Sequence, residues 1–252
     1  MRSSKALCLC TLIALLIGSL AASAAQAKDK WVVEGKVLPT GIANGKQIEV
    51  TAAEPIAFEV PALHEEVQCA KAEYRGSTGT GHALIWNEEV AGGIVGRQEG
   101  LLKFTLCKNT HKTCTVAAAE TLNTGSISGT LVNKVAGSNI YDMLAPEKWK
   151  ELKPAFSSFE PFATISQATP CFSGTISATG LAGEILNEST ESVVHTFKFL
   201  GKPACAVAPI SEVEQSNGAL DKIAMRVGSL TAEACAWMNI GLVSGEKWSV
   251  AA

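Results

Sequence analysis

Three residues with the side chains that zinc prefers lie close together near the middle of the chain. Cys107, His111 and Cys114 fall within eight residues, and thiolate and imidazole groups are the usual ligands of a tetrahedral zinc site. The segment has neither a further nearby ligand nor the paired Cys-x-x-Cys spacing of a zinc knuckle. The alternative is a disulfide between Cys107 and Cys114, which an oxidising compartment would favour. We therefore predict this disulfide, with no metal and no cofactor.

The histidines and serines do not fall into the motifs of common hydrolases. His64 is followed by two glutamates but not by the second histidine of a metalloprotease His-Glu-x-x-His motif. Gly125–Gly129 has the glycine spacing of a nucleophile elbow, but Ile127 stands where the serine should be. His195 lies on an apolar strand face, where we expect a hydrogen-bonded core histidine.

Two pairs of neighbouring carboxylates are candidates for the acid and base of glycoside hydrolysis. They are Glu65–Glu66 and Glu88–Glu89. Neighbouring residues on a strand point to opposite faces of a sheet, so the two carboxyl groups of each pair would point apart. Each pair is therefore interpreted as a solvated turn, and no catalytic residue is predicted.

The N-terminus has the three parts of a secretory signal peptide, which we assign to residues 1–27. A short start with two cations precedes the apolar stretch Leu7–Leu20, which is too short for a comfortable membrane span. Ala25–Ala27 is a small-x-small cleavage site, so cleavage is expected after Ala27, with Ala22–Ala24 as the alternative. No later stretch is long and apolar enough to cross a bilayer. The sequence therefore predicts export to the extracellular medium or the cell surface.

Removal of the signal peptide changes both the charge and the cysteine count. It takes away two cations and no anions, so the formal net charge falls from −3 to −5. A net negative chain with scattered charges has no basic patch that would attract nucleic acid or an anionic membrane. The cysteines fall from eight to six, and an even number in an exported chain indicates a disulfide framework. Beside Cys107–Cys114 we assign Cys205–Cys235, because both lie in the C-terminal part, and Cys69–Cys171, although other pairings stay open.

Alternating side chains predict a β-hairpin around the cysteine pair. Leu102, Phe104 and Leu106 alternate with a lysine and a threonine, which is typical of a strand with one buried face. Thr113–Val116 supplies β-branched residues for the return strand. Facing residues of such a pair come close enough for a disulfide.

Short strand-like segments separated by turn residues occupy most of the remaining chain. They are expected at 31–38, 47–51, 55–60, 66–71, 84–86, 93–96, 126–133, 162–167, 172–186, 193–200, 220–227, 234–243 and 247–250. Gly76–His82 matches neither a dinucleotide-binding motif nor a P-loop and is expected to be a hairpin loop. Two prolines at 146 and 154 predict a helical or irregular excursion over 138–159. The whole predicts an all-β fold, an antiparallel β-sandwich or barrel-like domain over residues 28–252.

The two ends of the mature chain each carry a tryptophan in a short apolar segment. Trp31 lies in the first expected strand and Trp248 in the last. Neither segment has a local partner that would bury a large aromatic side chain, and an isolated end strand would expose an unpaired edge. We therefore expect both strands to enter the same core, with the chain ends close together.

Short motifs along the chain carry a family resemblance. They are Trp31–Gly35 (WVVEG), Phe104–Cys107 (FTLC), Cys114–Val116 (CTV) and Leu242–Trp248 (LVSGEKW). The chain resembles a group of uncharacterised exported β-rich proteins of soil actinobacteria. The resemblance implies export and a β-rich architecture, and it implies no activity, ligand or catalytic residue. The Cys205 and Cys235 pair lies outside the shared pattern and resembles an added bridge.

Two functions of different classes are compatible with these features. The first is a non-enzymatic secreted or cell-surface protein that binds a ligand or forms part of the envelope. The second is a secreted hydrolase of an envelope or environmental polymer. The lack of a catalytic motif favours the first, whereas a pocket lined by histidine and carboxylates would favour the second.

Overall fold

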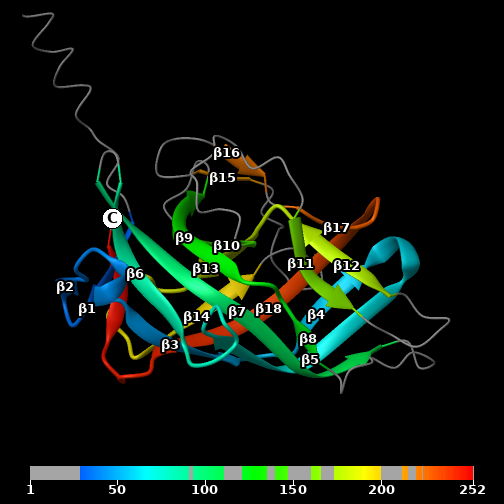
Figure 1. The fold of residues 1–252 in the computed structure, drawn as a ribbon, viewed down its shortest axis with the longest axis horizontal. Coiled ribbons are helices and arrows are strands. Elements are labelled where there is room, and N and C mark those ends of the chain that lie inside the picture. The colour runs from blue at the N-terminus through cyan, green and yellow to red at the C-terminus, as the bar shows by residue number, and fades with distance from the viewer. Residues whose placement is uncertain are drawn as a thin grey trace, which may run out of the picture.

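The chain folds almost entirely into antiparallel β-strands (Figure 1). The structure is a computed structural model that describes residues 29–90, 93–110, 121–134, 140–146, 160–165, 173–199, 212–214, 220–222 and 224–251. These residues form nineteen strands and two 3-10 turns, η1 (Ile42–Asn44) and η2 (Pro61–Leu63). The strands are β1 (Lys30–Val33), β2 (Lys36–Val37), β3 (Lys46–Ala52), β4 (Ile56–Val60), β5 (Glu65–Arg75), β6 (Ala83–Val90), β7 (Gly93–Asn109), β8 (Leu122–Asn123), β9 (Ile127–Lys134), β10 (Ile140–Pro146), β11 (Glu160–Ile165), β12 (Gly174–Ala178), β13 (Leu181–Ile185), β14 (Val194–Phe199), β15 (Glu212–Glu214), β16 (Leu220–Lys222), β17 (Met225–Val227), β18 (Leu230–Leu242) and β19 (Trp248–Ala251). The predicted all-β class is confirmed.

Eight strands close on themselves into a first ring. Hydrogen-bonded neighbours run in the order β9–β10–β13–β14–β18–β3–β6–β7, and β7 returns to β9 at Arg97↔Thr130 through Gly100↔Ile127. Each of these pairings is antiparallel. The first ring is thus the barrel-like form of the predicted fold class.

A second ring shares the long strands β7 and β18 with the first. In one direction from β18, hydrogen-bonded neighbours follow in the order β4, β5, β7 and β8. In the other direction, β18 pairs with β17, β17 with β12, and β12 with β11. An isolated bridge, Thr124↔Ala163, joins the β8 end to β11. In Figure 1, β7 and β18 cross the molecule from one group of strands to the other. These two strands therefore hold the two rings together.

Strand β7 presents one buried row to both rings. Gly96, Gln98 and Gly100 of this row lie in the first ring, and Leu102 and Phe104 lie in the second. The sequence suggested two shorter strands here, because the glycines interrupt the apolar alternation. The buried hydrophobic side chains of both rings form one continuous cluster. The two rings therefore have a common interior.

The disulfide pattern differs from the predicted one. Cys69 on β5 is bonded to Cys107 on β7, with a Cα–Cα distance of 3.9 Å. The two residues stand directly opposite each other in the antiparallel register of these strands. The predicted bridges Cys107–Cys114 and Cys69–Cys171 are therefore wrong, because each would need a cysteine that is already bonded.

The other cysteine predictions fall partly outside the described residues. Cys235 is disulfide-bonded, as expected, whereas its predicted partner Cys205 lies outside the described residues. His111, Cys171 and the expected return strand Thr113–Val116, which includes Cys114, also lie outside them.

A change of backbone conformation explains why Cys107 faces the core. Leu106 has a left-handed φ of 56°, and its side chain is 49% exposed instead of buried as the alternation predicted. Successive buried residues are normally two positions apart on a strand. Here they are three apart on both strands, at Cys69 and Ala72 on β5 and at Phe104 and Cys107 on β7. Both sulfurs consequently lie in a fully buried position.

The two ends of the described chain pair with each other. Strands β19, β1 and β2 form a small antiparallel sheet in which Val33 faces Trp248. Trp31 and Trp248 are each 1% exposed, and their rings meet edge to face with centroids 5.5 Å apart. The predicted burial of both tryptophans in one core is confirmed, and the terminal strands also pair directly with each other. The segment expected as one strand over 31–38 is instead a hairpin, because Glu34 and its neighbouring glycine take left-handed φ values of 49° and 69°.

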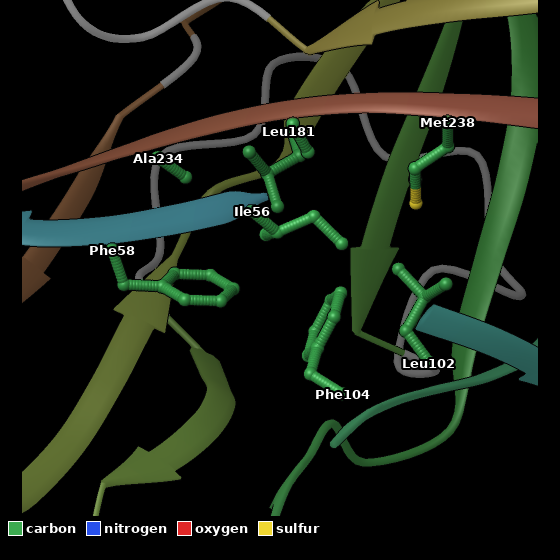
Figure 2. A pocket seen from close by; sticks show the side chains of 8 residues that line it. Ile56, Phe58, Leu102, Phe104, Leu181, Ala234 and Met238 are labelled. Atoms are coloured by element: carbon green, nitrogen blue, oxygen red, sulfur yellow. The ribbon is translucent and has the colours of Figure 1, made fainter. Parts of the chain in front are cut away.

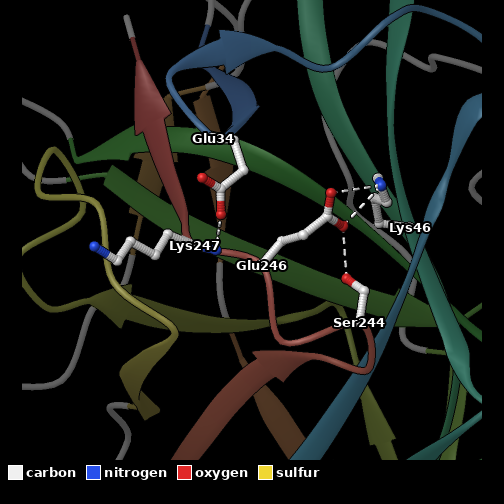
Figure 3. A network of polar contacts seen from close by, with 5 residues as sticks. All are labelled: Glu34, Lys46, Ser244, Glu246 and Lys247. Carbon is white, nitrogen blue, oxygen red and sulfur yellow. Dashed lines mark hydrogen bonds and ion pairs between the residues drawn. The ribbon is translucent and has the colours of Figure 1, made fainter.

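Polar contacts fasten this small sheet to the first ring (Figure 3). Lys46 Nζ on β3 lies 2.7 Å from Glu246 Oε2, which also accepts a 2.6 Å hydrogen bond from Ser244 Oγ. The Lys247 backbone N–H donates to Glu34 Oε1 at 2.8 Å. The turn before β19 is therefore bound both to β3 and to the β1–β2 hairpin.

The structure bears on two further expectations, the excursion over 138–159 and the lack of a membrane-spanning segment, only through its described residues. The helical or irregular excursion expected over 138–159 is wrong for Ile140–Pro146, which forms strand β10 because it pairs with β9 and β13; of the rest of this range, the structure describes nothing. Across the described residues, no helix has the length and apolarity needed to span a membrane. Whether residues 28–252 unfold as one cooperative domain stays a prediction.

Candidate functional site

A polar groove opens where β3 of the first ring meets the end of β5 of the second. Its volume is about 560 Å³, within the range of roughly 300–1,000 Å³ that is usual for ligand sites. Glu49, Val50 and Thr51 of β3 form one wall, Glu73–Arg75 of β5 forms another, and Gly79–His82 of the following loop completes it. The groove therefore combines carboxylate, guanidinium, hydroxyl and imidazole groups.

Glycines shape the loop that borders the groove. Gly79 and Gly81 have left-handed φ values of 84° and 69°, which side chains other than glycine rarely tolerate. A Cβ atom at Gly76 would lie 2.4 Å from the Thr80 carbonyl oxygen. The predicted loop over residues 76–82 is confirmed, and an Arg75↔His82 bridge closes its base.

An ion pair sets the electrostatics of the groove. Arg75 donates to the same oxygen of Glu73 from Nη2 at 2.5 Å and from Nε at 2.9 Å. Both side chains are largely exposed, at 38% and 48%, so water screens the attraction. Glu73 is thereby held as a hydrogen-bond acceptor, and Glu49 adds an exposed carboxylate on the opposite wall. The groove suits a polar ligand that offers hydroxyl or ammonium donors.

A second polar cluster lies inside the molecule. Gln98 Nε2 on β7 donates a hydrogen bond to Asp142 Oδ2 on β10, and Asp142 is fully buried. Burial raises the pKa of the Asp142 carboxyl well above its usual range, although the hydrogen bond from Gln98 opposes this shift. Burial, followed by the charges of Asp142 and Glu99, likewise raises the pKa of the Tyr74 phenol. Tyr74 also contributes to the lining of the groove, whereas its phenol oxygen and Asp142 Oδ1 are buried in the interior.

A small apolar gap lies between the two rings (Figure 2). Side chains from β4, β7, β13 and β18 surround it: Ile56, Phe58, Leu102, Phe104, Leu181, Ala234, Ala236 and Met238. The centre of a water-sized sphere can move through only about 10 Å³ of it. An apolar gap of this size stays dry and is a packing defect rather than a ligand site.

His195 is a structural residue, as predicted. It is 2% exposed, and its Nε2 and Nδ1 atoms lie 2.8 Å and 3.2 Å from the carbonyl oxygens of Trp248 and Leu186. The imidazole also packs against the Trp248 ring, with centroids 4.2 Å apart. His195 therefore joins β14 to the terminal strand β19 and has no access to the groove.

The other sequence candidates are not brought together. Glu65–Glu66 and Glu88–Glu89 lie within strands β5 and β6 rather than in turns. Glu88 pairs with Arg97 at 2.7 Å, and His64 ends the η2 turn with a left-handed φ of 53°. Among the residues that the structure describes, no group of three or more histidine, cysteine or acidic side chains could hold a metal ion.

Sequence inspection missed both polar clusters. The groove residues come from three separate segments, and no local spacing connects them. The sequence does contain one indication of the buried cluster: Asp142 is a lone carboxylate in the otherwise apolar run Ile140–Ala145. A weaker indication is Gln98, which lies midway between Gly96 and Gly100 on the buried row of β7.

Comparisons of the chain with known protein families, with curated proteins and with solved structures found no match.

Proposed function

We propose that this chain is an exported, non-enzymatic β protein that binds a polar ligand in the groove between β3, β5 and the Gly76–His82 loop. The observation that carries the proposal is the groove itself. It has the volume of a ligand site, and its walls come from strands that are held rigidly in two closed rings. Binding residues are often presented in this way, on a loop beside a rigid scaffold.

Export is supported by the N-terminal sequence and by the disulfide chemistry. Residues 1–27 have the pattern of a secretory signal peptide. Cys69–Cys107 and the bonded Cys235 suit an oxidising compartment outside the cytosol. The resemblance to exported actinobacterial proteins points the same way. Intact-mass measurement of the secreted protein should give a chain that begins at Lys28, whereas a full-length, membrane-held species would contradict export.

Ligand binding can be tested by nuclear magnetic resonance titration of the mature chain. We expect a neutral oligosaccharide or a polyamine to shift the amide signals of Gly79–His82 and β3 and to saturate. Glu49→Gln should weaken binding about tenfold, because a hydrogen bond to a charged group contributes roughly 1.5–3 kcal/mol. Glu88→Gln is the matched control, since Glu88 is also an exposed strand carboxylate but lies outside the groove. If neither probe shifts the groove signals, or both variants weaken binding equally, the proposal is wrong.

The alternative function is a secreted hydrolase, and one observation favours it. His82 lies in the groove with Glu49 and Glu73, so an imidazole and two carboxylates border the same space. Against it, Glu73 is held by Arg75 as an acceptor, which is a poor arrangement for a general acid. Incubation with chromogenic glycosides and esters should give no turnover. Turnover that His82→Ala abolishes would establish the hydrolase instead.

A further inference from the structure

Two glycines make room for the polar cluster inside the first ring. The ring of Tyr74 on β5 lies over Gly100, where an added Cβ would come within 2.6 Å of Tyr74 Cε2. The side chain of Gln98 lies over Gly129 of β9, where an added Cβ would come within 2.7 Å of the Gln98 amide carbon. Gln98 can therefore cross the inner face of the sheet to Asp142, and the Tyr74 ring lies beside it over Gly100.

Two polar atoms of this cluster are buried without a partner. Tyr74 Oη and Asp142 Oδ1 are shielded from solvent, and neither makes a hydrogen bond in the structure. Asp142 Oδ2, by contrast, accepts the hydrogen bond from Gln98. Gln98 and Gly100 are neighbours on the buried row of β7, and the Tyr74 ring lies over Gly100, so Tyr74 lies in the same region of the interior as the Gln98–Asp142 pair. Buried polar groups in folded proteins are nearly always paired with protein atoms or ordered water.

We infer that Tyr74, Gln98 and Asp142 form an interior site that holds at least one water molecule, which bridges Tyr74 Oη and Asp142 Oδ1. The hydrogen bond from Gln98 to Asp142 Oδ2 orients the carboxyl group, and Asp142 Oδ1 is then directed at the water. A buried water usually makes several hydrogen bonds to groups that would otherwise be unpaired. Two such groups are present here, and the phenol can either donate or accept.

The protonation state of Asp142 fits this arrangement. Because burial raises the pKa of this carboxyl, the neutral acid is favoured and supplies a proton on the oxygen that Gln98 does not engage. The water accepts the hydrogen bond from that proton and donates one to Tyr74 Oη. An uncharged network of this kind avoids placing an unpaired charge in the interior.

The size of the neighbouring space determines the class of ligand. Leu102, which faces Tyr74 across the β5–β7 pair, lines the apolar gap, and so does Leu181, which faces Leu144. That gap admits only about one water-sized sphere and presents no polar group. This gap therefore offers an organic ligand neither room nor a polar partner, and the ligand of the cluster is set by its two buried, unpaired oxygens, Tyr74 Oη and Asp142 Oδ1, which suit a water molecule.

Magnetic relaxation dispersion of water oxygen-17 counts long-lived internal water molecules in solution and can test this site. The mature wild-type chain should hold at least one more such water than the double variant Tyr74→Phe with Asp142→Leu, which removes both unpaired atoms. Tyr141→Phe is the matched control, because it removes another buried phenol from the opposite face of β10 and should leave the count unchanged. Asp142→Asn keeps both a donor and an acceptor and should retain the water.

Equal water counts in the wild type and the double variant would overturn the inference, as would loss of the water in Asp142→Asn. If the double variant does not fold, a crystal structure of the wild type beyond about 1.5 Å resolution decides the question. Water density within hydrogen-bond distance of both oxygens, about 2.5–3.0 Å, would support the site. A direct Tyr74 Oη–Asp142 Oδ1 hydrogen bond without water would refute it.

Discussion

At the scale of single residues, the interior is held by a few polar side chains whose hydrogen bonds are directed at particular backbone atoms. Asn87 is fully buried and bonds to both the N–H and the carbonyl of Trp31, and to the carbonyl of Leu38. His195 performs the same role for the terminal strand, because its ring nitrogens face the carbonyls of Trp248 and Leu186. Each residue ties the small terminal sheet, or the turn beside it, to the first ring.

The role of His195 can be measured by substitution. His195→Phe keeps a ring against Trp248 but removes the imidazole from the Trp248 carbonyl, which then keeps only the hydrogen bond from Ser192 N–H, so the free energy of unfolding should fall by about 0.5–1.5 kcal/mol. Urea unfolding of the mature protein gives this value. His64→Asn is the control, because His64 is exposed and asparagine tolerates its left-handed conformation. A loss no larger than that of the control would show that the hydrogen bonds of His195 are not needed.

The Glu246 carboxylate predicts a dependence of stability on pH. The hydrogen bond from Lys46, followed by that from Ser244, lowers the pKa of Glu246 in the folded chain. A carboxyl whose folded pKa lies below its unfolded pKa stabilises the fold above the unfolded pKa, and this contribution is lost as pH falls through the folded pKa. Glu246→Gln should therefore lower the melting temperature slightly at pH 7 and flatten its fall in acid.

Melting temperatures of the wild type and of Glu246→Gln, measured from pH 7 to pH 3, check this prediction. Glu54→Gln replaces another exposed carboxylate and serves as the comparison. Because the Lys46–Glu246 pair is about one-third exposed, the effect should also shrink in high salt. A parallel pH profile for the two proteins would contradict the assignment.

At the scale of elements, the pairing of β5 with β7 determines the disulfide. Cys69 and Cys107 are separated by 38 residues in the sequence, but the register of the two strands places them opposite each other. Peptide mapping without reduction should find these two cysteines joined. Replacing both with alanine should reduce stability by about 2–4 kcal/mol, the typical contribution of a disulfide. A Cys107–Cys114 peptide would contradict the strand register.

Most strands could be predicted from the sequence, whereas their partners could not. Alternating apolar residues identified β4, β14 and β17, because one buried face leaves a local pattern. The Cys107–Cys114 prediction failed because it assumed a local hairpin, and strand pairing depends on contacts between distant segments. Leu106 was misplaced for a related reason, since its left-handed backbone breaks the alternation. Asp142 shows the same limit, because its hydrogen-bond partner Gln98 lies far away in the sequence.

At the scale of the whole molecule, two closed rings share β7, β18 and one core. One buried cluster includes Trp31 and Trp248 of the small terminal sheet and Phe58 and Phe104 of the second ring. Closing the rings removes most strand edges, which protects the chain from association through unpaired strands. Because neither ring is complete without the shared strands, we expect them to fold and unfold together.

The most direct test of this account is denaturant unfolding of the mature chain, followed in parallel by tryptophan fluorescence and far-ultraviolet circular dichroism. The account predicts one transition with coincident curves. Phe197→Ala on β14 of the first ring and Phe58→Ala on β4 of the second should each lower the free energy of unfolding by about 3–5 kcal/mol without splitting the transition. Val37→Ala, at a 44% exposed position, should change it little. Two separate transitions, or a variant that unfolds only its own ring, would contradict the shared core.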